Sequence, residues 1–203
     1  MQTTIFETPV VNTLMRAVSR AILRLAGWRS AGLSRDELAA YPKFILIAAP
    51  HTSNWDFPFT LMVCFDLQLK VYWMAKASLF AWPIGWLSRW LGGIPINRGA
   101  KNNTVSNTID AFATRERLAI IVAPEGTRGR VTHWKTGFYH MAHGAGVPIA
   151  LAYLDFKKKT GGIGAMFTTT GDIEADMALI QAFYRGIEGK NPQQFDPAAV
   201  RRD

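Results

Sequence analysis

The sequence contains little cysteine, one residue in a chain of 203, and it lacks an unbroken run of about 18 apolar residues. A single cysteine excludes an internal disulfide. Cys64 lies in the apolar run 61–65, so it is expected to be a small core residue in a reducing compartment. Without a long apolar run, no membrane-spanning helix is expected. Residues 1–9 have no basic start followed by an apolar stretch, which argues against a signal peptide.

Motifs of several common activities are also missing. Neither of the usual Gly-rich phosphate loops occurs, and there is no Gly-x-Ser-x-Gly elbow, which disfavours a serine hydrolase. The densest basic cluster is Lys157-Lys158-Lys159, which is more typical of a solvated turn between strands than of a nucleic-acid-binding arm. Nucleic acid is therefore not an expected partner.

The composition that is present fits a globular protein. Apolar residues make up 49% of the chain, and its length favours a single domain over residues 1–203. The residues after Gly189, about 190–203, are expected to form a loosely ordered tail. A net charge of +8 accompanies seven Trp and twelve Phe. Basic and aromatic residues together are typical of proteins that meet nucleic acid, an anionic membrane surface or an anionic substrate.

Residues 10–28 predict an amphipathic helix. Apolar residues recur at spacings of three and four, and arginines form a separate i, i+4 row. The apolar positions are Val11, Leu14, Met15, Val18, Ile22 and Leu25, and the arginines are Arg16, Arg20 and Arg24. Two interpretations stay open: a helix packed on its own domain with a solvated arginine face, or a helix lying among anionic headgroups.

Strand and helix patterns alternate after this helix. The runs 44–49 and 118–123 are continuously apolar, the pattern of strands buried on both faces. Further strands are expected at 70–75, 94–97, 147–156 and 166–170, and helices at 58–68, 78–91, 103–117, 136–145 and 174–187. This alternation predicts an α/β fold with a mostly parallel sheet flanked by helices.

His51 and Asp56 come directly after the apolar run 44–49. The carboxyl end of a buried parallel strand is where α/β proteins place their active sites. On a regular helix the two residues would lie about 140° apart, but a turn over 52–55 lets them meet. Asp56 would then hold one ring nitrogen of His51 and leave the other as a general base near neutral pH. The alternative is that Asp56 caps a helix and His51 only ends a strand.

Two later segments supply cations and a carboxylate. Arg98 follows the expected strand at 94–97, and a guanidinium can bind phosphate through two parallel hydrogen bonds. The run 124–128, Pro-Glu-Gly-Thr-Arg, follows another buried strand and combines a rigid turn, a flexible glycine and Arg128. Glu125 would either position an acceptor hydroxyl or stabilise neighbouring arginines. Lys135 adds another cation at the start of a helix.

Together these segments resemble the glycerophospholipid acyltransferase family, which includes the lysophosphatidic acid (1-acylglycerol-3-phosphate) acyltransferases. That family carries four blocks in a fixed order, and each has a counterpart between residues 50 and 152. The run 51–56 matches His-x-x-x-x-Asp, 93–98 matches Gly-x-x-x-x-Arg, 124–128 contains Glu-Gly-Thr-Arg, and 147–149 matches the last block. Lys135-x-Gly137 resembles the segment that follows the third block. Each block alone is a weak match, but their order and spacing are specific.

The resemblance implies a glycerolphosphate-acyltransferase-like fold and an O-acyltransferase of phospholipid biosynthesis. His51 would deprotonate a hydroxyl of a lysophospholipid, which attacks the thioester of acyl-CoA or of an acyl-carrier protein, while Asp56 orients His51. The residues implied to bind the acceptor are Arg98, Glu125, Gly126, Thr127, Arg128 and Lys135. No metal and no cofactor is required, because the thioester is already activated. His140 and His143, three apart on a helix without an evident third ligand, are expected to be structural.

Departures from the family pattern leave the acceptor open. They are Ala49-Pro50 before the histidine, Ala123 before Pro-Glu-Gly, Gly129-Arg130 after the arginine, and Ala150-Leu151 after Pro148-Ile149. Two alternatives also stay open. The same His-Asp pair acting with water would make an acyl-thioester hydrolase, and a chain without catalysis would be a phospholipid-binding protein.

The spacing of the tryptophans suggests that the protein contacts its substrates at a membrane surface. Trp82, Trp86 and Trp90 recur at i, i+4 and i+8, which predicts one aromatic face on the helix 78–91. Tryptophans favour the interfacial zone of a bilayer, and an enzyme of acyl lipids needs an apolar access route. With the basic N-terminal helix, this favours a peripheral or monotopic protein on the cytoplasmic face of a membrane.

Overall fold

The apolar runs of the sequence form the middle of a seven-stranded sheet in the computed structural model, which describes residues 3–96 and 101–200. The strands are β1 (Arg29–Gly32), β2 (Lys43–Ala49), β3 (Tyr72–Lys76), β4 (Gly93–Ile96), β5 (Leu118–Val122), β6 (Ile149–Asp155) and β7 (Thr160–Phe167). Their order in the sheet is β1-β7-β6-β2-β5-β3-β4. The five strands β6, β2, β5, β3 and β4 are parallel to one another. β7 pairs antiparallel with β6, and β1 pairs parallel with β7 at the edge of the sheet. The predicted α/β fold with a mostly parallel sheet is confirmed.

β2 and β5 are buried on both faces, which is why each is a continuous apolar run in the sequence. Ile45 and Ile47 of β2 belong to a core cluster with Phe138, while Phe44 packs on the opposite face with Phe65. Successive residues of a strand point to opposite faces, so one strand supplies both cores. Burying one such side chain stabilises the folded state by about 2 kcal/mol. The middle of the sheet is therefore a rigid platform for the loops at its edge.

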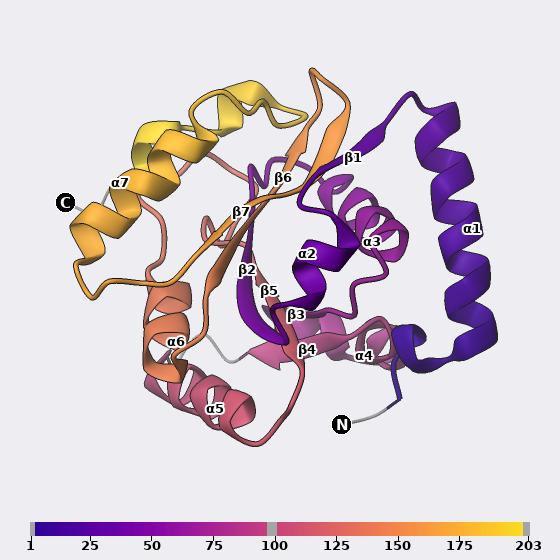
Figure 1. Ribbon diagram of the computed structural model, residues 1–203, viewed down its shortest axis with the longest axis horizontal. Coiled ribbons are helices and arrows are strands. Elements are labelled where there is room, and N and C mark those ends of the chain that lie inside the picture. Colours follow the sequence, from indigo (N-terminus) through magenta and orange to yellow (C-terminus); the bar gives the residue numbers. More distant parts are fainter. Residues whose placement is uncertain (1–2, 97–100, 201–203) are drawn as a thin grey trace.

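Helices cover both faces of the sheet. Figure 1 shows α1 and α3 on one side, and α5, α6 and α7 on the other. The α-helices are α1 (Pro9–Leu25), α2 (Arg35–Ala39), α3 (Asp56–Asp66), α4 (Gly85–Trp90), α5 (Lys101–Ala113), α6 (Gly137–Ala145) and α7 (Ile173–Tyr184). Short 3-10 helices are η1 (Ile5–Glu7), η2 (Ala77–Phe80), η3 (Pro192–Gln194) and η4 (Pro197–Val200). These layers leave the strand ends as the edge where loops can form a site.

The chain leaves β2 and β5, which are neighbours, in opposite directions. β2 leads through α3 past β5 to β3, whereas β5 leads through α6 past β2 to β6. Crossovers between parallel strands are right-handed, so opposite directions place α3 and α6 on opposite faces. The loops after β2 and β5 therefore diverge, and a cavity opens between them at the carboxyl edge of the sheet.

Two elements were missed by sequence analysis, and one strand was placed late. β1 and α2 are four and five residues long, too short to show a hydrophobic period. β7 begins at Thr160 rather than at 166, because glycines conceal its strand pattern. A Cβ added at Gly162 would lie 1.7 Å from the carbonyl oxygen of Ala31, so glycine is what allows β1 to pair so closely.

The predicted helix 78–91 is divided into η2 and α4, and its tryptophans do not share one face. Trp82 lies before α4 and is 92% exposed, Trp86 is 68% exposed, and Trp90 is partly buried against the core. Pro83 lies between the two short helices, where it interrupts the regular spacing that the prediction assumed.

The N-terminal helix predicted for 10–28 exists as α1, but its rotation on the protein is not the expected one. Ser19 and Leu23 are buried, and Arg20 forms an ion pair with Asp66 at the end of α3. Five apolar side chains are instead exposed: Val10, Leu14, Val18, Ile22 and Leu25. The arginine face is therefore solvated only in part, because Arg20 pairs with a partly buried aspartate on α3, whereas Arg24 is exposed. Within residues 3–96 and 101–200, no helix is both long and apolar enough to cross a bilayer.

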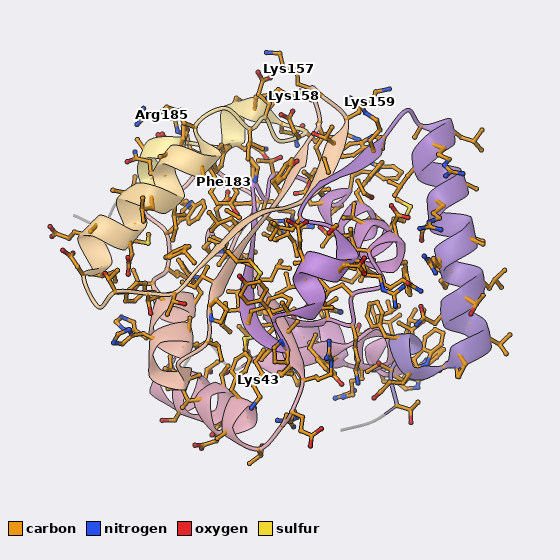
Figure 2. The ribbon with its side chains drawn as sticks, in the orientation of Figure 1. Lys43, Lys157, Lys158, Lys159, Phe183 and Arg185 are labelled. Atoms are coloured by element: carbon orange, nitrogen blue, oxygen red, sulfur yellow. The ribbon has the colours of Figure 1, made fainter. Side chains whose placement is uncertain are left out.

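The turn between β6 and β7 carries the basic cluster. Figure 2 places Lys157, Lys158 and Lys159 together at the tip of this hairpin, as predicted for a solvated turn. Lys157 forms an ion pair with Glu188, and Lys158 forms one with Asp155. Part of the positive charge of the cluster is thus neutralised within the chain.

Residues 190–199 are not the loosely ordered tail that the sequence predicted. They contain η3 and most of η4, and Asp196 forms an ion pair with Arg130 in the loop after β5 (2.7 Å). The expectation rested on the position of the segment near the end of the chain, whereas polar side chains such as Asp196 fix it to the domain. Residues 201–203 lie outside the described part of the chain.

Candidate active site

The loop after β2 brings His51 and Asp56 together. The chain passes a cis peptide bond between Ala49 and Pro50 and enters α3 at Asp56. His51 Nδ1 lies 3.2 Å from Asp56 Oδ2. The same carboxylate accepts hydrogen bonds from the backbone N–H groups of Thr52 (2.7 Å) and Ser53 (2.8 Å) and from the Ser53 hydroxyl (2.9 Å). Asp56 is the first residue of α3, whose N-cap is Trp55, and its carboxylate binds the His51 loop rather than the helix N-terminus. The pairing of His51 with Asp56 is therefore confirmed, and the alternative in which Asp56 caps the helix is wrong.

These contacts keep Asp56 ionised. Burial opposes the charge, but the contacts with His51 and with the Ser53 backbone and hydroxyl outweigh it and hold the pKa of Asp56 below its usual range. A carboxylate beside Nδ1 favours the tautomer with the proton on Nδ1, which leaves Nε2 with a lone pair. The His51 side chain is 28% exposed, so Nε2 remains open to a substrate.

The loop after β5 directs Glu125 beneath the His51 loop. Glu125 is 2% exposed, and its Oε1 accepts the backbone N–H of His51 at 2.6 Å. Burial raises the pKa of Glu125 to about 8; the His51 N–H opposes this rise, and the charge of Asp56 adds to it. At neutral pH the carboxyl is therefore mostly protonated. Glu125 thus supports the backbone that carries His51, and its expected contact with an acceptor stays a prediction.

Gly126 and Lys135 pack against each other in the same loop. Gly126 has a φ of 67°, in the left-handed region that favours glycine, and a Cβ there would lie 2.6 Å from Lys135 Nζ. The backbone N–H of Lys135 donates to the carbonyl of Pro124 at 2.9 Å. The glycine is thus required both by conformation and by the side chain that passes over it.

A cavity of about 1360 Å³ lies between the two loops, and His51 and Asp56 line it. Its lining on the α3 side is apolar and includes Leu61, Cys64, Leu67 and Ile163. Its lining on the α6 side includes basic and ionisable side chains, namely Arg128, His133, Lys135 and His140. The histidine therefore stands between an apolar region and a cationic region.

The site gathers most of the residues that the sequence indicated. Gly126, Thr127, Arg128 and Lys135 line the cavity, whereas Glu125 is not among the described residues that do. Arg98 lies outside the described residues.

Two histidines that the sequence did not indicate as site residues line the cavity. His133 and His140 line the cavity, although His140 had been expected to be structural. The only available signal was their position close to Lys135, which does not reveal the direction of a side chain. His143 Nδ1 instead lies 2.9 Å from Thr169 Oγ1. Among the described residues, no three His, Cys, Asp or Glu side chains are grouped to hold a metal ion.

A His-Asp pair between apolar and cationic linings, at the point where two crossovers diverge, defines an α/β site suited to an amphiphilic anionic substrate. Comparison with known proteins makes the class specific. The family model described as Acyltransferase matches residues 34–153, more than half of the chain. The chain therefore belongs to the acyltransferase family, and the resemblance drawn from the four blocks is confirmed.

Curated relatives carry a more specific name. The chain is 32% identical over 108 residues to the 1-acyl-sn-glycerol-3-phosphate acyltransferase of Salmonella typhimurium, and the match covers 50% of this chain and 42% of that protein. The enzymes of the same name from Haemophilus influenzae and Escherichia coli are 34% and 32% identical, with 49% and 50% of this chain and 42% of each relative covered. The chain thus matches less than half the length of these relatives.

A solved structure shares the fold. The 1-acyl-sn-glycerophosphate (LPA) acyltransferase PlsC from Thermotoga maritima aligns with a TM-score of 0.59 over 87% of this chain and 78% of that one, at 16% identity. At this identity the likeness shows a shared fold.

Proposed function

We propose that this chain transfers a fatty acyl group from a thioester to a hydroxyl of a lysophosphatidic-acid-like acceptor, in phospholipid biosynthesis. The observation that carries the proposal is the His51–Asp56 contact of 3.2 Å at the cavity wall, with Asp56 held by three further hydrogen bonds. In such a pair the carboxylate orients the imidazole so that its other nitrogen can act as a general base. The family to which the chain belongs and the names of its relatives support the same reaction.

The chemistry requires one base and no covalent intermediate. Nε2 of His51 accepts the proton of the acceptor hydroxyl while the oxygen attacks the thioester carbonyl and a C–O bond forms. The C–S bond then breaks, and the leaving thiolate takes the proton from His51. Asp56 stabilises the imidazolium that exists between these two steps. No cofactor is needed, since the thioester is already activated.

The cationic lining is proposed to bind the phosphate of the acceptor. Arg128 and Lys135 lie in the cavity on the α6 side, and Gly126 and Thr127 bring the backbone close to it. A guanidinium binds phosphate through paired hydrogen bonds, and an ammonium binds it as a point charge. Arg98 of the second family block is proposed to join them.

The apolar lining is proposed to hold the acyl chain. Apolar side chains of α3 and of the residue after it, including Leu61 and Leu67, line the cavity and can cover methylene groups. The donor is acyl-CoA or an acyl-carrier-protein thioester, because either presents the same reacting carbonyl.

A membrane surface is proposed as the source of the acceptor. The exposed apolar row of α1, together with Trp82 and Trp86, is apolar surface of the kind that inserts at a bilayer interface, and the net charge of +8 favours anionic headgroups. Ser78, Leu79 and Ser88, close to these tryptophans in the chain, line the cavity. We place this contact at the cytoplasmic face, as a peripheral or monotopic attachment. Co-sedimentation with anionic but not with neutral phosphatidylcholine vesicles is expected; failure to bind either would reject it.

One assay tests the reaction. Purified protein is given labelled acyl-CoA or acyl-carrier protein and, separately, lysophosphatidic acid, glycerol phosphate, a lysolipid without a phosphomonoester, or an acylated amino-acid lipid, and products are resolved by mass spectrometry. Ester formation that depends on a phosphate-bearing acceptor is expected. Thiol release at the same rate without any acceptor would identify a hydrolase instead.

A pair of variants shows whether His51 is the base. His51→Ala is expected to lower the rate of transfer at least about 1000-fold with an unchanged circular dichroism spectrum. His143→Ala is the control. His143 lies in the last turn of α6, where its side chain contacts Thr169. Equal activity of the two variants would refute the assignment.

A further inference from the structure

The segment 188–199, which we name the C-terminal strap, crosses both loops of the site although it lies beyond the residues that match the family. Its backbone lies directly on the His51 loop, because a Cβ added at Gly189 would be 2.6 Å from Thr52 Oγ1 and 3.0 Å from Pro50 Cβ. The backbone N–H of Asn191 donates to Thr52 Oγ1 at 3.2 Å, and its side-chain amide donates to the Thr52 carbonyl at 2.8 Å. The strap thus holds Thr52 from two sides.

Gln194 joins this contact to the second loop. One terminal atom of its amide lies 2.7 Å from the carbonyl oxygens of both Thr52 and Arg128, so this atom is assigned as the nitrogen that donates one hydrogen to each. Further along, the carbonyl of Ala199 accepts the backbone N–H of Trp134 at 2.8 Å. The strap therefore connects the loop after β2 with the loop after β5, from which the cationic lining of the cavity comes.

The peptide group between Thr52 and Ser53 links the strap to the histidine. Its carbonyl accepts the hydrogen bonds from Asn191 and Gln194, and its N–H donates to Asp56 Oδ2 at 2.8 Å. A peptide group is planar, so fixing the carbonyl also fixes the direction of the N–H. Hydrogen bonds at both ends polarise the group and strengthen each other. Asp56 Oδ2 is the oxygen that faces His51 Nδ1.

We propose that Asn191 and Gln194 are positioning residues for the His51–Asp56 pair, acting through the Thr52–Ser53 peptide, and that they set the distance between this pair and the loop that carries Arg128. The proposal rests on acyl transfer by His51 as the proposed function. Neither amide touches the reacting atoms. Their effect is to hold Asp56, and through it the imidazole, in the orientation that transfers a proton, where a displacement of about 1 Å costs up to about 100-fold in rate.

The kinetic test compares two neighbouring glutamines and one asparagine. Asn191→Ala and Gln194→Ala are each expected to lower kcat about tenfold and to change the KM of the acyl donor by less than about twofold. Gln193→Ala is the matched control and is expected to be unchanged, since Gln193 is exposed. Asn191→Asp keeps the size of the side chain but replaces the donor by an acceptor, so it should lose as much activity as Asn191→Ala.

A second background separates positioning from a general loss of structure. In Asp56→Asn protein, the added Asn191→Ala change should reduce residual activity by less than about twofold, because residues that act as one unit are not additive. The same tenfold loss in that background, or activity of the strap variants equal to that of Gln193→Ala, would overturn the proposal. If the unmodified protein transfers no acyl group, the proposed function fails first.

Hydrogen exchange tests the physical link without any assay of activity. The amide of Ser53 should exchange about fivefold faster in Asn191→Ala than in Gln193→Ala protein, the effect of losing about 1 kcal/mol of hydrogen bonding. Amides of β5 should keep the same protection in both variants. Unchanged exchange at Ser53 would show that the strap does not hold this peptide.

Discussion

Glu125→Gln separates the charge of the buried carboxyl group from its shape. Glutamine places an amide oxygen where Glu125 Oε1 accepts the His51 N–H, but it cannot ionise. We therefore expect the wild-type protein to lose stability relative to the Glu125→Gln variant as the pH rises. The physical reason is that burial raises the pKa of Glu125 to about 8 in the folded protein, from an ordinary 4.5.

The sign and the size follow from proton linkage. With its pKa raised, Glu125 keeps a proton in the folded state that the unfolded chain has already released. Its contribution to stability is therefore complete below pH 4.5 and is lost as the pH rises through about 8. Each unit of difference in pKa corresponds to about 1.4 kcal/mol, so the wild type should lose about 3 kcal/mol relative to the variant between about pH 5.5 and about pH 9.

Urea unfolding followed by tryptophan fluorescence measures this difference at each pH. Glu116→Gln is the control for the substitution itself, because Glu116 is an exposed glutamate before β5. A wild-type minus Glu125→Gln difference that stays flat over this range would refute the raised pKa. Stability of the wild type that increased over the range, relative to the variant, would refute the buried neutral carboxyl group.

Three further substitutions test other parts of the site. Asp56→Asn should lower kcat about 1000-fold, because an amide no longer stabilises the imidazolium; a loss below about tenfold would contradict this role. Arg128→Ala should raise the KM of a phosphate-bearing acceptor about tenfold, equivalent to about 1.4 kcal/mol of binding, and leave a phosphate-free acceptor unaffected; an equal effect on both would exclude a phosphate contact. Gly126→Ala should lower the free energy of unfolding by about 1–2 kcal/mol in thermal or urea unfolding, because of its φ of 67° and the closeness of Lys135 Nζ. Gly129→Ala is the control, since a Cβ there meets nothing within 4 Å, and equal stability of the two variants would contradict the argument.

The contacts of Glu125 and Gly126 show that neighbouring residues of the Glu-Gly-Thr-Arg block have different roles. Glu125 and Gly126 are adjacent, yet one is turned inward under His51 and the other lies at the cavity below Lys135. Adjacent residues in a tight turn point in different directions, so one short motif can supply both a support for the histidine and a surface for the substrate.

The fold could be predicted as far as its signals are local. β2 and β5 are continuous apolar runs because both of their faces are buried, and the polar residues that follow each run are visible in the sequence as candidates for a site. β7 could not be placed correctly, because its glycines are explained only by the close approach of β1, a strand more than 120 residues earlier in the chain.

The candidate site also has features that local sequence patterns predict and features that they do not. The sequence by itself determined that His51 and Asp56 follow a buried strand at a spacing that a turn can close, and that Arg128 and Lys135 follow another. Hydrophobic periodicity and turn chemistry depend on residues within a few positions of each other, so they can be read along the chain.

Only the tertiary structure decided that β2 and β5 are neighbours, that Glu125 lies beneath His51, that the apolar row of α1 is exposed, and that the strap reaches Thr52. Each of these depends on contacts between residues far apart in sequence. The direction of a side chain and the partner of a buried polar group are set by the elements packed around it, and no local pattern encodes them.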